Sequence, residues 1–339
     1  MLLTRSLAGE KLSVPPIWIM RQAGRYLAEY RAVRETTSDF ISFCLSPEKA
    51  CEVTLQPIRK FGFDAAIIFS DILIVPWALD RNVHFITGEG PKCTPLQSDD
   101  VISDTLVQNV RDKYKPVGEA VALTRASLPQ ETDLIGFAGA PWTLMTYMIE
   151  GGSSKDYAQS RNWLWGHQKE TDRLLDILVE TISQSLILQA EKGADALMLF
   201  DSWASAVPSD LRPWIIEKPA QRIIEIVRAK GIDLPFICFP RGISADLPRF
   251  ADHVDCQGLA IDQGVSLEFA AKTIRQDITL QGNLDPQALI YGGDMMRRHI
   301  DHILEAMKDR AHIFNLGHGI TPPTPVDHVH ELISYVRGK

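Results

Sequence analysis

Four arginines stand close together near the start of an acidic chain. Arg21, Arg25, Arg31 and Arg34 lie within residues 18–34, whereas the whole chain has 35 lysines and arginines against 43 aspartates and glutamates, a net charge of −8. A guanidinium group stays charged at any working pH and can hold a carboxylate or phosphate through two parallel hydrogen bonds. This local excess of positive charge therefore indicates a site for a ligand with several carboxylates or phosphates. In a helix Arg21 and Arg25 would share one face, whereas in a loop Gly24 would free the backbone between them.

Four further side chains could do chemistry, and each also has a simpler structural role. Asp71 lies in an apolar stretch where an unpartnered carboxylate is costly to bury, but it could also cap a helix. Tyr147 could form part of an aromatic wall. Ser202 could cap the following helix, and no G-x-S-x-G elbow marks it as a nucleophile. His318 stands between two glycines, which would allow close backbone approach and exposure.

Short apolar runs recur along the chain, as expected for strands of a parallel sheet that is buried on both faces. There are eight such runs, at residues 16–20, 65–69, 134–138, 196–200, 235–239, 258–261, 278–281 and 312–315. Between them the spacing predicts helices that include residues 46–60, 167–192, 213–230, 293–308 and 325–337.

Eight strands alternating with helices favour a single (β/α)8 TIM barrel. A doubly wound sheet is the rival fold, but no strand is followed by GxGxxG or GxxxxGK[ST]. No linker, repeat or low-complexity stretch divides residues 1–339, so we expect one domain. In such a barrel the chemistry lies in the loops after the strands. Arg21, Asp71, Tyr147, Ser202 and His318 all fall in those loops.

The composition argues against several classes of protein. With 45% apolar and 23% charged residues the chain resembles an ordinary globular protein, and no apolar stretch is long enough to span a membrane. An acidic chain without a broad basic stripe is not expected to bind nucleic acid. The five cysteines form no CxxC pair, and the start of the chain lacks the apolar segment of a signal peptide, so we expect reduced thiols in the cytoplasm. The scattered histidines have no metal-ligand spacing, so no metal site is predicted.

Several motifs resemble the uroporphyrinogen decarboxylase family. They are Met20-Arg-Gln-Ala-Gly-Arg-Tyr-Leu27, Leu55-Gln-Pro-Ile-Arg59, Asp64-Ala-Ala-Ile-Ile-Phe-Ser-Asp-Ile-Leu73, Gly136-Phe-Ala-Gly-Ala-Pro-Trp-Thr-Leu144, Gln281-Gly-Asn-Leu-Asp-Pro286 and Asn315-Leu-Gly-His-Gly319. They occur in order over nearly the whole chain. The resemblance implies a dimeric, cofactor-free (β/α)8 barrel that converts the four acetate side chains of uroporphyrinogen III to methyl groups, giving coproporphyrinogen III on the haem pathway.

The resemblance also implies roles for individual residues. Asp71 would point at the centre of the macrocycle, with Arg21, Tyr147 and His318 completing the catalytic group. Substrate contacts would come from Arg21, Gln22, Ala23, Gly24, Arg25, Arg34, Asp71, Tyr147, Phe200, Ser202 and His318. Two places depart from the family pattern, because Arg241 stands where lysine is usual and Gln263 where many members have tryptophan. These departures affect the rim of the site.

Chemical reasoning accounts for these roles. Eight substrate carboxylates explain the arginines, and an ionised Asp71 accepts hydrogen bonds from the pyrrole N–H groups. Once a ring carbon is protonated, the pyrrole becomes an electron sink for decarboxylation, and Asp71 would stabilise the resulting cation. The proton donor is left open between Arg21, a substrate carboxyl group and a water held by Tyr147 or His318.

Two other functions compete with this hypothesis. A zinc-dependent corrinoid methyltransferase of the same superfamily would need thiolate and imidazole ligands, and Cys238 and Cys256 alone do not complete such a site. A non-catalytic tetrapyrrole carrier would need the arginines but no acid to stabilise a cation.

Overall fold

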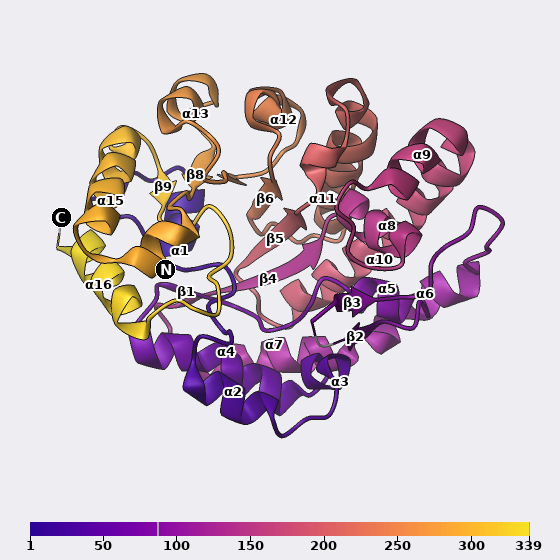
Figure 1. Cartoon of the computed structure of the whole chain (residues 1–339), viewed down its shortest axis with the longest axis horizontal. Coiled ribbons are helices and arrows are strands. Elements are labelled where there is room, and N and C mark those ends of the chain that lie inside the picture. Colours follow the sequence, from indigo (N-terminus) through magenta and orange to yellow (C-terminus); the bar gives the residue numbers. More distant parts are fainter. Residues whose placement is uncertain (87, 339) are drawn as a thin grey trace.

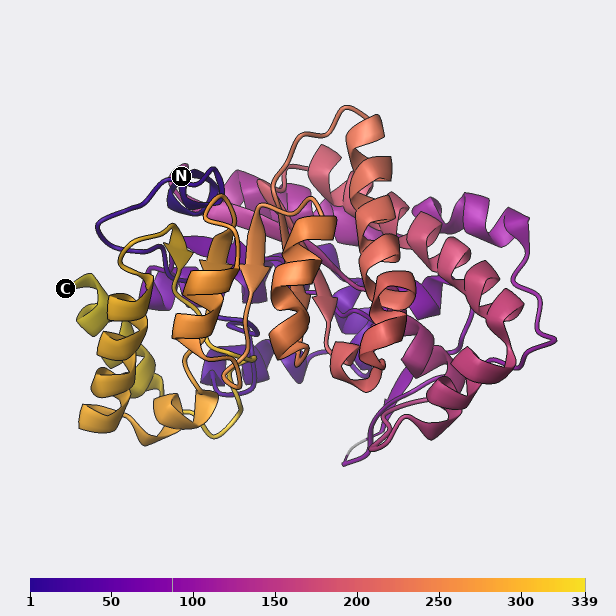
Figure 2. The same cartoon turned by 90° about the horizontal axis from the view of Figure 1, so that it is seen from above.

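A curled parallel sheet forms the centre of the molecule, with helices around it (Figures 1 and 2). The computed structural model describes residues 1–86 and 88–338. Seven strands pair in the order β1-β4-β5-β6-β7-β8-β9. Their bounds are β1 Ala65–Ile67, β4 Asp133–Gly139, β5 Ala196–Asp201, β6 Phe236–Pro240, β7 Gly258–Ala260, β8 Thr279–Gln281 and β9 His312–Ile313. The fold is therefore a TIM-like α/β arrangement, and seven of the eight predicted runs contain a strand.

The first predicted strand, residues 16–20, is the exception. It makes only an isolated parallel bridge between Ile17 and Phe314. Its backbone N–H groups are diverted to side chains: Ile17 donates to Asp64 Oδ2, Ile19 to Gln22 Oε1 and Met20 to Asn315 Oδ1. A ladder needs these donors for a neighbouring strand, so the segment is extended without becoming a regular strand.

The helices cover the outside of the sheet. The five predicted segments correspond to α4 Pro47–Phe61, α10 Gln168–Glu191, α11 Lys218–Ala229, α15 Gly293–Met307 and α16 Val326–Arg337, and a π-helical turn at Pro213–Glu217 precedes α11. The other helices are α1 Leu2–Leu7, α2 Ala28–Arg34, α3 Phe40–Cys44, α5 Ile74–Ala78, α6 Asp104–Lys113, α7 Lys115–Ser127, α8 Pro141–Glu150, α9 Ala158–Gly166, α12 Leu247–His253, α13 Leu267–Thr273 and α14 Pro286–Tyr291. Strands β2 His84–Ile86 and β3 Gly90–Lys92 form a separate antiparallel pair.

The buried side chains form two apolar clusters. The larger cluster lies between the sheet and the helices, and the smaller one joins inward-facing side chains of the strands to α1. Leu3 and Leu7 of α1 are completely or almost completely buried in this inner cluster. The backbone N–H of Leu3 donates to Asp133 Oδ2, and the Ser6 hydroxyl donates to the carbonyl of His312. Because Asp133 and His312 begin their strands, α1 closes the N-terminal end of the sheet and leaves the C-terminal end for a site.

Across residues 1–86 and 88–338, no helix is both long and apolar enough to cross a membrane.

Candidate active site

The arginine-rich segment is a turn before it becomes a helix. Arg21 has a φ of 64°, in the left-handed region that non-glycine residues rarely adopt, and α2 begins only at Ala28. Arg21 and Arg25 therefore do not share a helical face, and the loop alternative is correct. A Cβ at Gly24 would lie 2.9 Å from the carbonyl oxygen of Arg21, so the turn needs a residue without a side chain.

This turn presents charge and hydrogen-bond donors that the protein itself does not use. The side chains of Arg21 and Arg25 are exposed, and neither forms an ion pair with another described residue. The backbone N–H groups of Ala23, Gly24 and Arg25 also have no acceptor in the described part of the chain. Guanidinium groups beside free backbone N–H groups can hold carboxylates.

Gln22 supports the turn from below. Its side chain is fully buried, accepts from the backbone N–H of Ile19 and donates to the carbonyl of Ala65, while the Tyr26 hydroxyl donates to its carbonyl. The Gln22 side chain therefore fastens the turn to β1. These hydrogen bonds hold Arg21 and Ala23 in the turn.

Arg34, on α2, lies in an aromatic group next to the same site. Its guanidinium carbon is 5.8 Å from the ring centre of Phe40 and 5.6 Å from that of Phe43, and one nitrogen donates to the carbonyl of Thr37 at 2.5 Å. Arg34 and Asp71 act with opposite sign on the pKa of Cys44, which burial raises. Arg34 thus lies in the neighbourhood of Asp71, but part of its binding capacity is used within the protein.

Asp71 follows β1 and is half-buried. Its Oδ1 accepts from the backbone N–H of Leu73 at 2.8 Å, just before α5 begins, so the expected turn role is present. Oδ2 has no partner among the residues the structure describes. Burial raises the pKa of Asp71 to about 6, while the hydrogen bond from Leu73 and the positive charge of Arg21 lower it. Asp71 can therefore be ionised at neutral pH with one oxygen available to a ligand.

Aromatic rings line the neighbouring strands β4, β5 and β6. Phe137, Phe200 and Phe239 lie on three adjacent strands and pack edge to face, with ring centres 5.5 and 6.3 Å apart. Tyr147 of α8 is half-buried, and burial raises its pKa to about 12, with smaller effects from Asp71 and Arg21. These rings give the strand ends an apolar floor and wall.

Ser202 follows β5 and is half-buried. It caps no helix, because Trp203 is the residue before the 3-10 turn Ala204–Ala206, and no hydrogen bond of its hydroxyl occurs among the described residues.

His318 lies close to Arg21. A Cβ at Gly319 would overlap the Cγ and Cδ of Arg21, and one at Gly317 would overlap the backbone nitrogen of Gln263, so both glycines allow close approach as expected. Burial, followed by the positive charges of Arg21 and Arg241, lowers the pKa of His318 to about 4. The imidazole is therefore neutral at pH 7. Its Nδ1 accepts from the backbone N–H of Gly319 at 2.5 Å, which leaves Nε2 as the protonated nitrogen.

The structure adds residues that the sequence did not single out. Trp203 lies between Tyr147 and Tyr157, with ring centres 6.1 and 5.3 Å away. Asp262 is buried and accepts from the backbone N–H groups of Gly242 and Gly264, both at 2.8 Å. Only the position of Asp262 after a predicted strand could have indicated this role.

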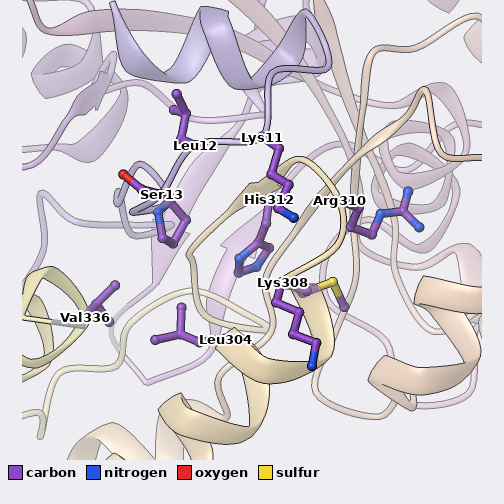
Figure 3. A pocket seen from close by; sticks show the side chains of 10 residues that line it. Lys11, Leu12, Ser13, Leu304, Lys308, Arg310, His312 and Val336 are labelled. Atoms are coloured by element: carbon purple, nitrogen blue, oxygen red, sulfur yellow. The ribbon is translucent and has the colours of Figure 1, made fainter.

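The described surface includes two cavities that lie near opposite ends of the strands. One, of about 220 Å³, lies at the N-terminal end of the strands, where Figure 3 shows Lys11, Leu304 and His312 around it. The other, of about 570 Å³, is lined by residues that include Tyr157, Arg161 and Ser205, and it lies beside the C-terminal strand ends. In residues 1–86 and 88–338, no three or more His, Cys, Asp or Glu side chains are grouped so that they could hold a metal ion.

The fold and the site define a TIM-like α/β protein that carries exposed arginines and a half-buried carboxylate near its C-terminal strand ends. The chain matches the sequence model of the uroporphyrinogen decarboxylase (URO-D) family over residues 1–338, and it belongs to that family.

Relatives named uroporphyrinogen decarboxylase support this assignment. The protein from Maricaulis maris (strain MCS10) is 46% identical over 333 residues, covering 98% of this chain and 96% of the relative. The protein from Rhodospirillum rubrum is 43% identical over 334 residues, covering 98% and 96%. Among solved structures, a methyltransferase from Methanosarcina mazei has a TM-score of 0.79 at 19% identity, covering 99% of this chain and 97% of that chain, which is a likeness of fold.

Proposed function

We propose that this chain is a carboxy-lyase that decarboxylates the four acetate side chains of uroporphyrinogen III, giving coproporphyrinogen III and four molecules of carbon dioxide for porphyrin biosynthesis. The observation that carries this proposal is the half-buried Asp71 carboxylate, which has one oxygen without a partner among the described residues and lies within electrostatic reach of Arg21. Family membership supports the reaction, and the unpaired Arg21 and Arg25 suit a substrate with eight carboxylates.

In the proposed mechanism, Asp71 Oδ2 accepts hydrogen bonds from the pyrrole N–H groups at the centre of the macrocycle. Protonation of a ring carbon next to the reacting acetate makes the pyrrole cationic. The bond to the carboxylate then breaks, its electron pair enters the ring, and carbon dioxide leaves. Protonation of the methylene carbon and loss of the ring proton give the methyl group. An ionised Asp71 stabilises the cationic intermediate over the apolar floor of Phe137, Phe200 and Phe239.

The remaining residues have supporting roles in this proposal. Arg21, Arg25 and the free N–H groups of Ala23 and Gly24 bind substrate carboxylates. Arg34 also binds a substrate carboxylate, Phe200 packs near the ring, and Tyr147 and Ser202 contact the edge of the macrocycle. The neutral His318 donates a hydrogen bond through Nε2. Gln22 fastens the turn.

We further infer that residues 1–339 form one closed (β/α)8 barrel, with residues 16–20 as its eighth member. Three backbone hydrogen bonds support closure: Phe314 donates to Pro16, Trp18 to Phe314 and Asp64 to Ile17. The family resemblance favours a cytoplasmic homodimer that needs no cofactor.

The fold alone also suits a methyltransferase, because a protein of that name has a similar structure. That activity would require a zinc site of thiolate and imidazole ligands. The decarboxylase proposal does not depend on such a site.

The test is anaerobic incubation of the purified protein with uroporphyrinogen III, followed by chromatography of the oxidised porphyrins. We expect species with seven, six, five and four carboxyl groups. Asp71→Asn should stay folded and lose about 10²- to 10³-fold in kcat, because it removes the charge that faces the cation. Asp99→Asn, at an exposed aspartate, is the matched control. A wild-type protein that leaves only the eight-carboxyl species, or near-normal turnover by Asp71→Asn, would contradict the proposal.

A further inference from the structure

Arg241 has a fixed backbone and a side chain without a protein partner. It follows β6, its N–H donates to the carbonyl of Asp201 at 3.1 Å, and its carbonyl accepts from Ser205. The next residue, Gly242, donates to Asp262 Oδ2. The guanidinium group is half-buried, and no acceptor or ion-pair partner for it occurs in residues 1–86 and 88–338. An arginine held in this way is available to an anion from outside the chain.

The positive charge of Arg241 acts on two titratable groups, His318 and Tyr157. Arg241 lowers the pKa of His318 and acts in the same direction on that of Tyr157, which burial raises. Arg21, by contrast, acts on the pKa of Asp71, Tyr147 and His318, whereas Arg241 has no such effect on Asp71. Arg241 is therefore held beside Asp201 and Ser205, and its charge acts on His318 but not on Asp71.

A rigid aromatic edge joins this position to the rest of the site. Trp203 donates its backbone N–H to the Thr143 hydroxyl, and its carbonyl accepts from the indole N–H of Trp142. Tyr157 packs against Trp203 and has a φ of 56°, a strained backbone that the surroundings must maintain. A ligand at Asp71 could therefore extend along Tyr147 and Trp203 toward Tyr157.

The cavity of about 570 Å³ begins where this edge ends. Tyr157 and Ser205 line it, together with three basic residues, Lys155, Arg161 and Arg212. Arg212 is paired with Asp246, but Lys155 and Arg161 have no ion pair among the described residues. In a chain with a net charge of −8, two unpaired cations, Lys155 and Arg161, beside one opening suit an anionic ligand.

We propose that Arg241 binds a propionate carboxylate of the substrate, and that Arg161 and Tyr157 extend this second anion-binding wall into the adjoining cavity. This inference rests on the proposed function. A propionate is favoured because the four propionates remain through all four reactions, whereas the acetates are lost one by one. A group that binds a carboxylate present in the ground state and the transition state alike changes KM and leaves kcat nearly unchanged.

The test compares Arg241→Gln, Arg241→Lys and Arg161→Gln with wild type. KM and kcat are measured with the eight- and five-carboxyl porphyrinogens, and Kd is measured with coproporphyrin III, whose carboxylates are all propionates. For Arg241→Gln we expect KM and Kd to rise about tenfold with kcat within about twofold, and for Arg241→Lys to retain most of the affinity. Arg161→Gln, at an exposed side chain, should raise Kd in the same direction by a smaller factor. Arg173→Gln, on the outer helix α10, is the charge-matched control.

Three results would overturn the inference: Kd and KM of Arg241→Gln within twofold of Arg173→Gln, a loss confined to kcat, or a KM effect on the eight-carboxyl substrate only. Failure of the proposed function is a separate result, because wild type would then release no carbon dioxide while the coproporphyrin Kd values would still test Arg241. If Arg241→Gln fails to fold, Arg241→Met, which keeps the aliphatic part of the side chain, takes its place in the same comparison. Unchanged affinity in Arg161→Gln would contradict the extended wall.

Discussion

Arg21 and Asp71 influence each other's role through charge. Burial would keep the carboxyl group neutral to a higher pH, and the adjacent guanidinium opposes this effect. The positive φ of Arg21 is an unfavourable backbone conformation for a residue with a side chain. In this conformation the guanidinium group lowers the pKa of the Asp71 carboxyl group. In the proposed reaction Arg21 therefore both binds substrate and keeps Asp71 ionised.

A pH profile tests this coupling. In wild type the acid limb of kcat/KM should have an apparent pKa near 6, because ionised Asp71 is the active form. In Arg21→Gln the pKa of Asp71 should rise, so the limb moves to higher pH and activity at pH 7 falls further than at pH 8. Arg25→Gln removes a nearby charge that does not act on Asp71 and should leave the limb in place. An unmoved limb in Arg21→Gln would refute the coupling.

The sequence predicted the residue types of this site better than their conformations. Arginines in an acidic chain and an aspartate after an apolar run were visible, but the left-handed turn at Arg21 depends on packing against Gly319, far away in the chain. The departure of Arg241 from the family pattern points to the rim, but its backbone contacts with Asp201 and Ser205 have no signal in the sequence. Long-range contacts of this kind have no periodic signature.

At the scale of elements, loops between strands meet through glycines. Gly317 and Gly319 stand on either side of His318, but a side chain at each would meet a different obstacle. At Gly317 the obstacle is the backbone of Gln263, which cannot move without shifting the loop after β7. At Gly319 it is the side chain of Arg21, which can move.

Alanine at Gly317 should therefore reduce mainly stability, whereas alanine at Gly319 should reduce mainly activity. Gly317→Ala should lower the free energy of unfolding by about 1–3 kcal/mol, because overpacking displaces backbone. Gly319→Ala should cost less than about 1 kcal/mol in stability but lower kcat/KM about tenfold or more, because it displaces Arg21. Denaturant unfolding and steady-state kinetics on both variants make the comparison. Equal stability losses would show that the obstacle at Gly319 is also rigid.

Asp201, at the end of β5, is a buried carboxyl group in contact with α8, and it should make the free energy of unfolding depend on pH. Asp201 accepts from the Thr143 hydroxyl at 2.6 Å, and burial raises its pKa to about 7, against an unfolded value near 4. Between about pH 4 and 7 the folded protein holds this proton more tightly than the unfolded chain, so the contribution to stability falls as pH rises through this window. The side chain of Asp201→Asn cannot ionise. The free energy of unfolding of this variant, relative to that of wild type, should therefore increase by about 1–3 kcal/mol from pH 5 to pH 8. Thermal melts at both pH values, with the exposed Asp252→Asn as control, check this; a constant difference would contradict it.

The element boundaries show where local pattern was sufficient. Helices such as α4 and α10 were predicted to within a residue at most ends, because apolar spacing and terminal glycines are local signals. Residues 16–20 read as a strand for the same reason. They lack a ladder because the side chains of Asp64, Gln22 and Asn315 take their N–H groups, and two of these residues lie far away in the sequence.

At the scale of the whole molecule, one end of the sheet is packed with apolar side chains and the other end is where we propose the active site. α1 fills one end, where Leu7 is 1% exposed and packs so closely that a side chain on Gly258 would touch it. The proposed site occupies the opposite end. Stability and catalysis should therefore be separable by mutation.

Leu7→Ala tests this separation. Removal of a buried leucine side chain should lower the free energy of unfolding by about 2–5 kcal/mol, since the strands around it cannot close over the cavity. kcat and KM measured well below the melting temperature should stay within about twofold of wild type, because the arginine turn and Asp71 lie beyond the inner apolar cluster. Leu123→Ala, at a leucine that is 41% exposed on α7, should change stability by less than about 0.5 kcal/mol. If Leu7→Ala instead lost activity in proportion to its stability, α1 would be supporting the geometry at the far end of the strands, and the two ends of the sheet would be mechanically coupled.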